Sequence, residues 1–236
     1  MYIVITGASR GIGSFLAWSL SQSQNVPVSK LYLIYRSSDK EMKKTVSRLT
    51  CDCEVFKCDV ANEVEVSATF QKFPEIDVLI NNAGTTCDSL VTKMSEEAWD
   101  KVLNVNLKGA FLCSKNAIPK MTRFGSQIIN ISSVLAKSGA YGAANYATSK
   151  GGLEAFTRSL SREVIKKGIF VNAIALGFFD IGLGLRLPTK VKQAAIQRTL
   201  MGTLGPPAEI TKLVEYLINQ RFMVGQVLHL NGGYEI

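Results

Sequence analysis

The chain has 236 residues, of which 47% are hydrophobic and 19% are charged, a composition typical of a soluble globular protein. A chain of this length can bury a full core, so it needs neither disulfides nor a structural metal to fold. The net charge of +8 favours acidic partners, but does not choose between an anionic cofactor, an acidic protein and nucleic acid.

The histidine and cysteine content argues against several kinds of site. The only histidine, His229, lies far in sequence from Cys51, Cys53 and Cys58. We therefore expect no metal site, and we expect His229 to be a strand residue rather than a catalytic base. Mechanisms of the Ser-His-Asp or Cys-His type are also disfavoured. The five cysteines are expected to be reduced, as is usual in the cytoplasm.

The start of the chain is an apolar run over residues 2–5, which is typical of a first strand rather than of a secretion signal. No uninterrupted apolar stretch reaches the length needed to span a membrane. We therefore expect a cytoplasmic protein with no membrane partner.

Short apolar runs then alternate with longer amphipathic segments along the chain. The strands are expected at residues 2–6, 30–35, 53–57, 76–80, 126–131, 169–174 and 226–230. The helices are expected at residues 11–23, 39–49, 62–72, 95–122, 145–167 and 206–219. This order predicts an α/β fold with a Rossmann-type, doubly wound, parallel seven-stranded sheet flanked by helices on both faces. No repeat or linker divides the chain, so residues 1–236 should form a single domain.

A glycine-rich turn follows the first predicted strand. Gly7 permits a tight turn, while Gly11 and Gly13 let the backbone approach a pyrophosphate at the start of the next helix. The context of a strand before and a helix after makes this a nucleotide-binding prediction. The turn also contains Ser9, Arg10 and Ile12.

The second predicted strand ends at Arg36, and no carboxylate follows before Asp39. A carboxylate at this point would bind the adenosine ribose 2′-hydroxyl and repel a 2′-phosphate. Arg10 and Arg36 can instead converge on a phosphate, for which the guanidinium geometry is suited. These residues predict NADP(H) rather than NAD as the cofactor.

Tyr146 and Lys150 are four residues apart and share one face of a predicted helix. A nearby ammonium favours the phenolate, so we expect Lys150 to bring the pKa of Tyr146 toward neutrality. Tyr146 could then exchange a proton with a carbonyl oxygen, which Ser133 would hydrogen-bond. The segment 177–190, rich in glycine and apolar residues, is predicted to be a flexible loop that folds over a ligand.

Taken together, these motifs resemble the classical short-chain dehydrogenase/reductase family over nearly the whole chain. The resemblance rests on the turn at 6–13, Asp59-Val60, Asn81-Asn82-Ala83-Gly84, Asn106, Ser133, Tyr146-x-x-x-Lys150 and Asn231-Gly232-Gly233. It implies an NADP-dependent oxidoreductase acting on CH–OH/C=O groups. It assigns catalysis to Asn106, Ser133, Tyr146 and Lys150, with Asn106 holding a water that links Lys150 to solvent. It assigns cofactor binding to the glycine turn, Arg36, Asp59, Val60, Asn82, Ala83, Gly84, Tyr146, Lys150 and Gly177.

Two departures from the family pattern lie beside the expected nicotinamide pocket. Leu176 stands where the family usually has proline before Gly177, and Ile181 replaces a threonine that commonly contacts the carboxamide. Loss of that hydrogen bond, worth about 1 kcal/mol, predicts weaker cofactor binding or an altered lid rather than lost chemistry.

Within the family, the segments 97–107 and 146–168 are most similar to 3-oxoacyl-[acyl-carrier-protein] reductases. The resemblance implies an acyl thioester on an acidic carrier protein as substrate, in fatty-acid or related lipid or polyketide synthesis. It places carrier docking at Arg123, Lys166 and Lys167. It also implies a homotetramer built through residues 95–122, 145–167 and the last strand, where Gly151, Gly152 and Ala155 would permit close helix contact.

Two other functions remain open. One is an NADPH-dependent reductase of a different ketone, such as a polyketide intermediate, sugar or small alcohol. The other is a cofactor-binding regulator without turnover, which Leu176 and Ile181 motivate and the intact catalytic set opposes. Specific nucleic-acid binding has no recognisable motif in the chain.

Overall fold

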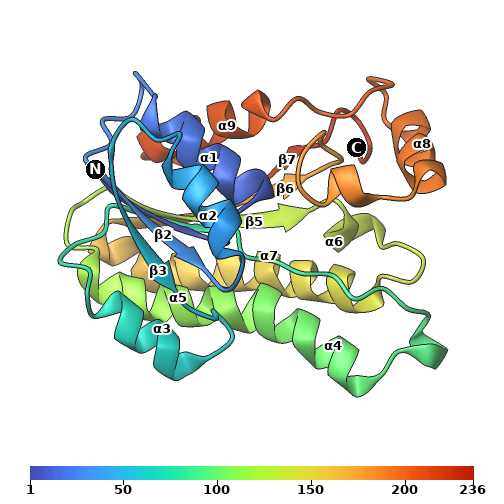
Figure 1. Cartoon of the computed structure of the whole chain (residues 1–236), viewed down its shortest axis with the longest axis horizontal. Helices are drawn as coiled ribbons and strands as arrows, with labels where there is room; N and C mark the ends of the chain where they lie inside the picture. The colour runs from blue at the N-terminus through green and yellow to red at the C-terminus, as the bar shows by residue number, and fades with distance from the viewer.

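The computed structural model describes the backbone of residues 1–236 and every side chain except that of Arg186. Seven strands form one parallel sheet in the order β3-β2-β1-β4-β5-β6-β7 (Figure 1). They are β1 (Tyr2–Thr6), β2 (Lys30–Tyr35), β3 (Asp52–Lys57), β4 (Val78–Asn81), β5 (Ser126–Ser133), β6 (Ile169–Leu176) and β7 (Val227–Leu230). The predicted α/β fold and doubly wound sheet are confirmed, and His229 lies in β7 as expected.

The strands differ in burial according to their place in the sheet. The interior strands β5 and β6 are buried along all eight residues, because helices cover both faces of a parallel sheet. The edge strand β3 is mostly exposed and carries charged side chains, which discourage pairing with another chain. Strands β5 and β6 are longer than predicted, since their ladder continues to the pair Ser133 and Leu176.

The helices form two layers (Figure 1). Helices α1 (Gly11–Ser21), α2 (Asp39–Val46) and α9 (Ala208–Asn219) cover one face of the sheet and share one apolar core. Helices α3 (Glu63–Phe70), α5 (Gly109–Ala117) and α7 (Ala144–Val164) cover the other face and share a second core. The described helices include none long and apolar enough to cross a membrane.

The predicted helix 95–122 is confirmed as one unbroken helical run over residues 96–120, which contains a π-helical stretch. The chain forms α4 (Glu96–Leu103), a π-helical turn η2 (Asn104–Lys108), α5, and a 3₁₀ turn η3 (Ile118–Lys120) that contains Pro119. At Gly109 the backbone packs against Val60, leaving no room for a side chain. This contact and the side-chain bonds of Asn106 are tertiary, so helical periodicity alone does not reveal the π-helical turn.

Two short helices differ from the expected order of elements. Helix α6 (Leu135–Ser138) directly follows β5, and α8 (Thr189–Arg198) follows a 3₁₀ turn η5 (Gly184–Arg186). Helix α8 has a single buried residue, Ala195, so its sequence lacks the apolar stripe by which a helix is recognised. The segment 177–190 is thus a loop that ends in the first turn of α8.

The small residues predicted to serve subunit contacts have different surroundings. A side chain at Gly152 would meet the end of the Leu107 side chain at 2.8 Å, so Gly152 packs against Leu107 of the same chain. Ala155 is exposed on α7. The homotetramer remains a prediction.

The order of the strands reverses between β1 and β4, since β2 follows β1 on one side and β5 follows β4 on the other. At such a switch point the loops after the two strands diverge to opposite faces and leave a crevice at the carboxyl edge of the sheet. The fold therefore predicts where a ligand binds.

We expect Phe73→Ala to lower the free energy of unfolding by about 3–5 kcal/mol. Phe73 is fully buried, and its ring centroid lies 4.5 Å from that of Tyr32, 5.0 Å from that of Phe56 and 5.1 Å from that of Phe70. Urea denaturation measures the loss. The control is Phe222→Ala, whose side chain is 96% exposed; equal effects of the two substitutions would contradict this account of the core.

Candidate active site

A cavity of about 890 Å³ opens at the carboxyl edge of the sheet, where the switch point lies. Most of the predicted site residues line it. They are Gly7, Ser9, Arg10, Gly11, Ile12, Arg36, Asp59, Val60, Asn82, Ala83, Gly84, Ser133, Tyr146, Lys150 and Gly177. Gly13 and Asn106 lie behind its walls rather than in its lining. The glycine turn and the Tyr146–Lys150 pair, far apart in sequence, thus belong to one cavity.

The glycine turn leaves its backbone open to a ligand. Gly7 and Gly11 have φ angles of +68° and +58°, a left-handed conformation that favours glycine. A side chain at Gly13 would clash with the Gly7 carbonyl oxygen and the Asn82 amide. Helix α1 begins at Gly11 with no side-chain cap from Arg10. Its first N–H groups are therefore free to bind an anion.

The Thr6 hydroxyl joins the glycine turn to the loop after β4. Thr6 Oγ1 accepts hydrogen bonds from the backbone N–H groups of Asn82 and Ala83, each at 3.0 Å. The Asn82 side-chain amide returns a bond to the Thr6 carbonyl at 2.9 Å. Thr6 is the first residue of the motif at 6–13, and its place at the carboxyl end of the first strand is the signal in the sequence for this linking role.

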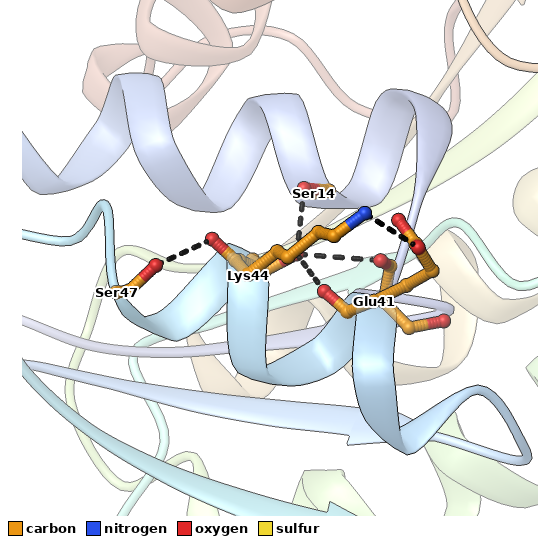
Figure 2. Close-up of polar contacts among 6 residues, drawn as sticks. Ser14, Glu41, Lys44 and Ser47 are labelled. Carbon is orange, nitrogen blue, oxygen red and sulfur yellow. Dashed lines mark hydrogen bonds and ion pairs between the residues drawn. The ribbon is translucent and has the colours of Figure 1, made fainter.

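Helix α2 is also anchored to the glycine turn. The buried Thr45 hydroxyl lies 2.7 Å from Ser14 Oγ of α1 and 3.3 Å from the Ser9 carbonyl oxygen, to which it donates. Figure 2 shows Ser14 facing α2, where Glu41 and Lys44 form an ion pair of 3.0 Å. These contacts hold the turn after β2 close to the glycine turn.

Arg36 lies at the end of β2 and lines the cavity. Its guanidinium lies 3.7 Å from a carboxylate oxygen of Asp59, and both side chains are partly exposed. Ser38, two residues further on, has a φ angle of +88° and is the one non-glycine residue with a positive φ among the described residues. This strained turn carries Arg36 and Ser37 into the cavity wall.

The predicted catalytic side chains meet where β5 and α7 converge. Ser133 ends β5, and Tyr146 and Lys150 lie one turn apart on α7. Lys150 is only 4% exposed. Its ammonium donates to the Ile131 carbonyl oxygen at 2.7 Å and lies 5.7 Å from the centroid of the Tyr146 ring.

Burial dominates the ionisation of this pair. Removal from water raises the pKa of Tyr146 to about 12, against a hydrogen bond from Ser133 that lowers it. Removal from water also lowers the pKa of Lys150 to about 8, against the attraction of Glu154. The pKa of Tyr146 is thus raised rather than brought toward neutrality, contrary to the expectation, because desolvation of the phenolate is the largest influence on it.

Asn106 lies at the π-helical turn η2 and is 1% exposed. Its side chain accepts from the Thr85 N–H at 2.8 Å, and it donates to the Thr85 carbonyl and to Ser149 Oγ, each at 3.0 Å. Asn106 thus ties the loop after β4 to α7. Its predicted role in holding a water stays a prediction.

Several lining residues lie outside the set predicted to bind a ligand. The segment 177–190 contributes Phe178, Phe179, Ile181, Leu183 and Leu185, which form an apolar wall. The departure Leu176 also lines the cavity. Asp88 lines it as well, and burial raises the pKa of its carboxyl. The negative charge of Asp88 also raises the pKa of Tyr146, so the two side chains interact electrostatically.

The residues predicted to dock a carrier protein lie away from this cavity. Arg123 immediately precedes β5, and Lys166 and Lys167 precede β6, so all three are at the amino edge of the sheet. Arg123 is paired with Glu75 at 2.7 Å and with Asp77 at 3.6 Å. These residues cannot flank the mouth of their own chain's cavity, because that mouth lies at the carboxyl edge.

Comparisons with known proteins agree with this site. A family model described as enoyl-(acyl carrier protein) reductase matches residues 7–235. The solved structure of a mutant short-chain dehydrogenase/reductase from Serratia marcescens superposes with a TM-score of 0.92 at 25% identity, covering 100% of this chain and 98% of that one. The chain belongs to the short-chain dehydrogenase/reductase family of nicotinamide-dependent oxidoreductases.

Relatives within the family carry a more specific name. The chain is 38% identical to the 3-oxoacyl-[acyl-carrier-protein] reductase of Rickettsia felis, over 98% of this chain and 95% of the relative. It is 36% identical to the protein of the same name from Staphylococcus aureus, over 98% and 96% respectively. The family resemblance inferred from the motifs is confirmed.

We expect Lys150→Met to make the protein more stable at pH 7. An unfolded lysine keeps its proton up to about pH 10, whereas buried Lys150 releases its proton near pH 8. Between these values the unfolded state binds more protons, so the stability of the natural protein rises with pH. At pH 7 the variant should melt roughly 5 °C higher, and the difference should shrink from pH 8 to pH 10.

Thermal unfolding followed at several pH values measures this difference. Lys212→Met is the matched control, because the Lys212 side chain is 69% exposed and should show no such trend. Melting curves of the Lys150→Met variant that stay parallel to those of the natural protein at all pH values would contradict the burial of a charged Lys150.

Proposed function

We propose that the protein catalyses the NADPH-dependent reduction of a 3-oxoacyl thioester, carried on acyl carrier protein, to the 3-hydroxyacyl form in fatty-acid or related lipid synthesis. One observation carries the proposal: the cavity has an anion-binding glycine turn at one end and Ser133, Tyr146 and Lys150 at the other. The names of the relatives support the choice of substrate.

The cavity fits a nicotinamide dinucleotide. A side chain at Gly13 would clash with its neighbours, so glycine keeps the backbone of this turn uncovered. The start of α1 has no side-chain cap, and its free N–H groups suit a pyrophosphate. Arg10 and Arg36 would hold a 2′-phosphate, and Asp59 and Val60 lie where the adenine is expected. When bound, the reduced nicotinamide supplies a hydride to the carbonyl carbon.

The side chains supply position and the proton. The Ser133 hydroxyl donates a hydrogen bond to the carbonyl oxygen and stabilises the negative charge that develops on it. The Tyr146 phenol transfers its proton to the same oxygen, so that C=O becomes CH–OH. With a pKa of about 12, Tyr146 holds this proton at neutral pH. The Lys150 ammonium then offsets the charge of the resulting phenolate.

The description of the family model, an enoyl reductase, names a different reaction that reduces C=C rather than C=O. The site favours the carbonyl, because Ser133 and Tyr146 together offer two O–H groups to one oxygen. The apolar wall of residues 178–185 suits an acyl chain. A reductase of another ketone would use the same residues and remains the alternative.

Docking of the carrier at Arg123, Lys166 and Lys167 requires a second subunit. Since these residues lie at the amino edge, they can serve only the cavity of a neighbouring copy. The proposed homotetramer is consistent with this arrangement, and carrier docking across subunits follows from the two proposals together.

We expect Tyr146→Phe to lower the rate of 3-oxoacyl reduction roughly thousandfold, because the proton donor is lost. NADPH consumption with carrier-linked and small-thiol-linked 3-oxoacyl substrates measures the rate. NADPH binding, followed by fluorescence titration, should change less than about twofold, since the substitution removes one oxygen atom.

The same assay separates the alternatives. Turnover that favours the carrier-linked substrate and falls with salt supports the proposal. Turnover confined to small free ketones or to 2-enoyl thioesters would show that the substrate is not a 3-oxoacyl thioester. Full activity of Tyr146→Phe would overturn the assignment of Tyr146 as the proton donor.

We expect Arg36→Ala to raise the KM for NADPH roughly tenfold, because a charged hydrogen bond to the 2′-phosphate is lost. The KM for NADH, which has no 2′-phosphate, should stay within about twofold. Arg158→Ala on the exposed part of α7 is the control. Equal losses for NADPH and NADH would contradict a phosphate-binding role for Arg36.

A further inference from the structure

The residues after β7, 231–235, lie beside the cavity, where Tyr234 packs against the lining residue Phe178, and we call them the tail brace. The Asn231 side chain shapes it, since it accepts from the Gly233 N–H and donates to the Glu235 carbonyl oxygen, each at 2.8 Å. The Gly232 carbonyl oxygen accepts from the Met201 N–H at 3.1 Å. The tail brace is therefore ordered against the chain that follows α8.

Glu235 links two helices that are far apart in sequence. Its carboxylate lies 3.1 Å from the Lys137 ammonium of α6 and 3.7 Å from the Arg198 guanidinium of α8. Figure 1 shows the end of the chain in the region of α6 and α8. The Glu235 side chain is only 18% exposed, so water screens these pairs less than it screens a surface pair.

Glu235 is the only described carboxylate within 4.0 Å of either cation. A single, largely buried carboxylate thus pairs with two cations whose own side chains are 56% and 52% exposed. The link between the two helices depends on this one side chain.

Tyr234 extends the brace to the cavity wall. The Arg198 guanidinium lies 4.3 Å from the centroid of the Tyr234 ring and donates to its hydroxyl at 3.3 Å. The Tyr234 ring also packs against Phe178, with 5.0 Å between centroids. Phe178 lines the cavity, so the brace is in contact with the apolar wall.

The two linked helices border the substrate end of the cavity. Leu135, the first residue of α6, lines the cavity two residues after Ser133. Pro188, at the start of α8, lines it as well. The outer ends of these helices, Lys137 and Arg198, are the ends that Glu235 joins. A link between α6 and α8 therefore joins two segments that each contribute to the lining of the cavity, through Leu135 and Pro188.

We propose that Glu235 is a positioning residue that holds α6 and α8 at the spacing required to bind the acyl part of the substrate. The identity of that substrate rests on the proposed function, whereas the link between the helices does not. Glu235 touches neither the predicted cofactor residues nor Tyr146, so it acts on substrate binding rather than on the chemical step.

The test is Glu235→Gln, which keeps the shape of the side chain and removes its charge. The KM for the 3-oxoacyl thioester should rise about fivefold, the scale expected for a partly buried ion-pair network. The kcat and the KM for NADPH should stay within about twofold, because the variant loses uniform substrate binding. Amide hydrogen exchange should become faster in residues 135–139 and 189–199.

Glu209→Gln is the matched control, since Glu209 forms a single ion pair of 2.8 Å with Lys212 on α9. It should change neither the KM nor the exchange. Glu235→Asp, which keeps the charge, should restore most of the exchange protection. The combined variant Lys137→Gln with Glu235→Gln should resemble Glu235→Gln alone, because Glu235→Gln has already removed the ion pair that Lys137 forms.

Unchanged hydrogen exchange in α6 and α8 of Glu235→Gln would overturn the proposal, as would a fall in kcat without a rise in KM. Hydrogen exchange needs no substrate, so it also tests the brace if the protein does not reduce 3-oxoacyl thioesters. In that case the activity assay rejects the proposed function, and hydrogen exchange separately decides whether Glu235 links α6 and α8.

Discussion

The Thr6 hydroxyl holds together the carboxyl ends of β1 and β4, and the rest of the site depends on that contact. It accepts hydrogen bonds from the backbone of Asn82 and Ala83, at the point where the strand order reverses. On one side, this places the glycine turn at the start of α1. On the other side, it positions the loop that Asn106 ties to α7, and with it Tyr146 and Lys150.

Folding buries the ammonium group of Lys150, although burial disfavours its charged form. Burial lowers the pKa of Lys150 and raises that of Tyr146, so the neutral phenol holds its proton while the ammonium lies in an apolar environment. A single bond of 2.7 Å to the Ile131 carbonyl holds the ammonium. In the proposed mechanism, this local loss of stability keeps the proton donor Tyr146 beside its charge partner Lys150.

Sequence patterns predict the features that depend on residues close in the chain. They do not predict the features that depend on tertiary contacts. The strands follow from apolar runs and the glycine turn from its spacing, and both are in place. The segment 95–122 is helical, as its periodicity predicts, but the π-helical turn at 104–108, beside the Gly109–Val60 contact and the bonds of Asn106, is not visible in the sequence. Helix α8 escapes prediction because it buries only Ala195. Resemblance assigns Arg123 to carrier docking, and only the fold shows that it lies at the amino edge of the sheet, away from its own chain's cavity.

The sequence by itself determined the fold class, the order of elements, the nucleotide-binding turn and the pairing of Tyr146 with Lys150, because each follows from residues close in the chain. Only the tertiary structure decided which side chains are buried and which distant side chains are in contact. The direction of the Tyr146 pKa depends on how much water burial removes, and the partners of Glu235 depend on how three distant segments meet. Desolvation and long-range contact are properties of the packed chain, and no local pattern encodes them.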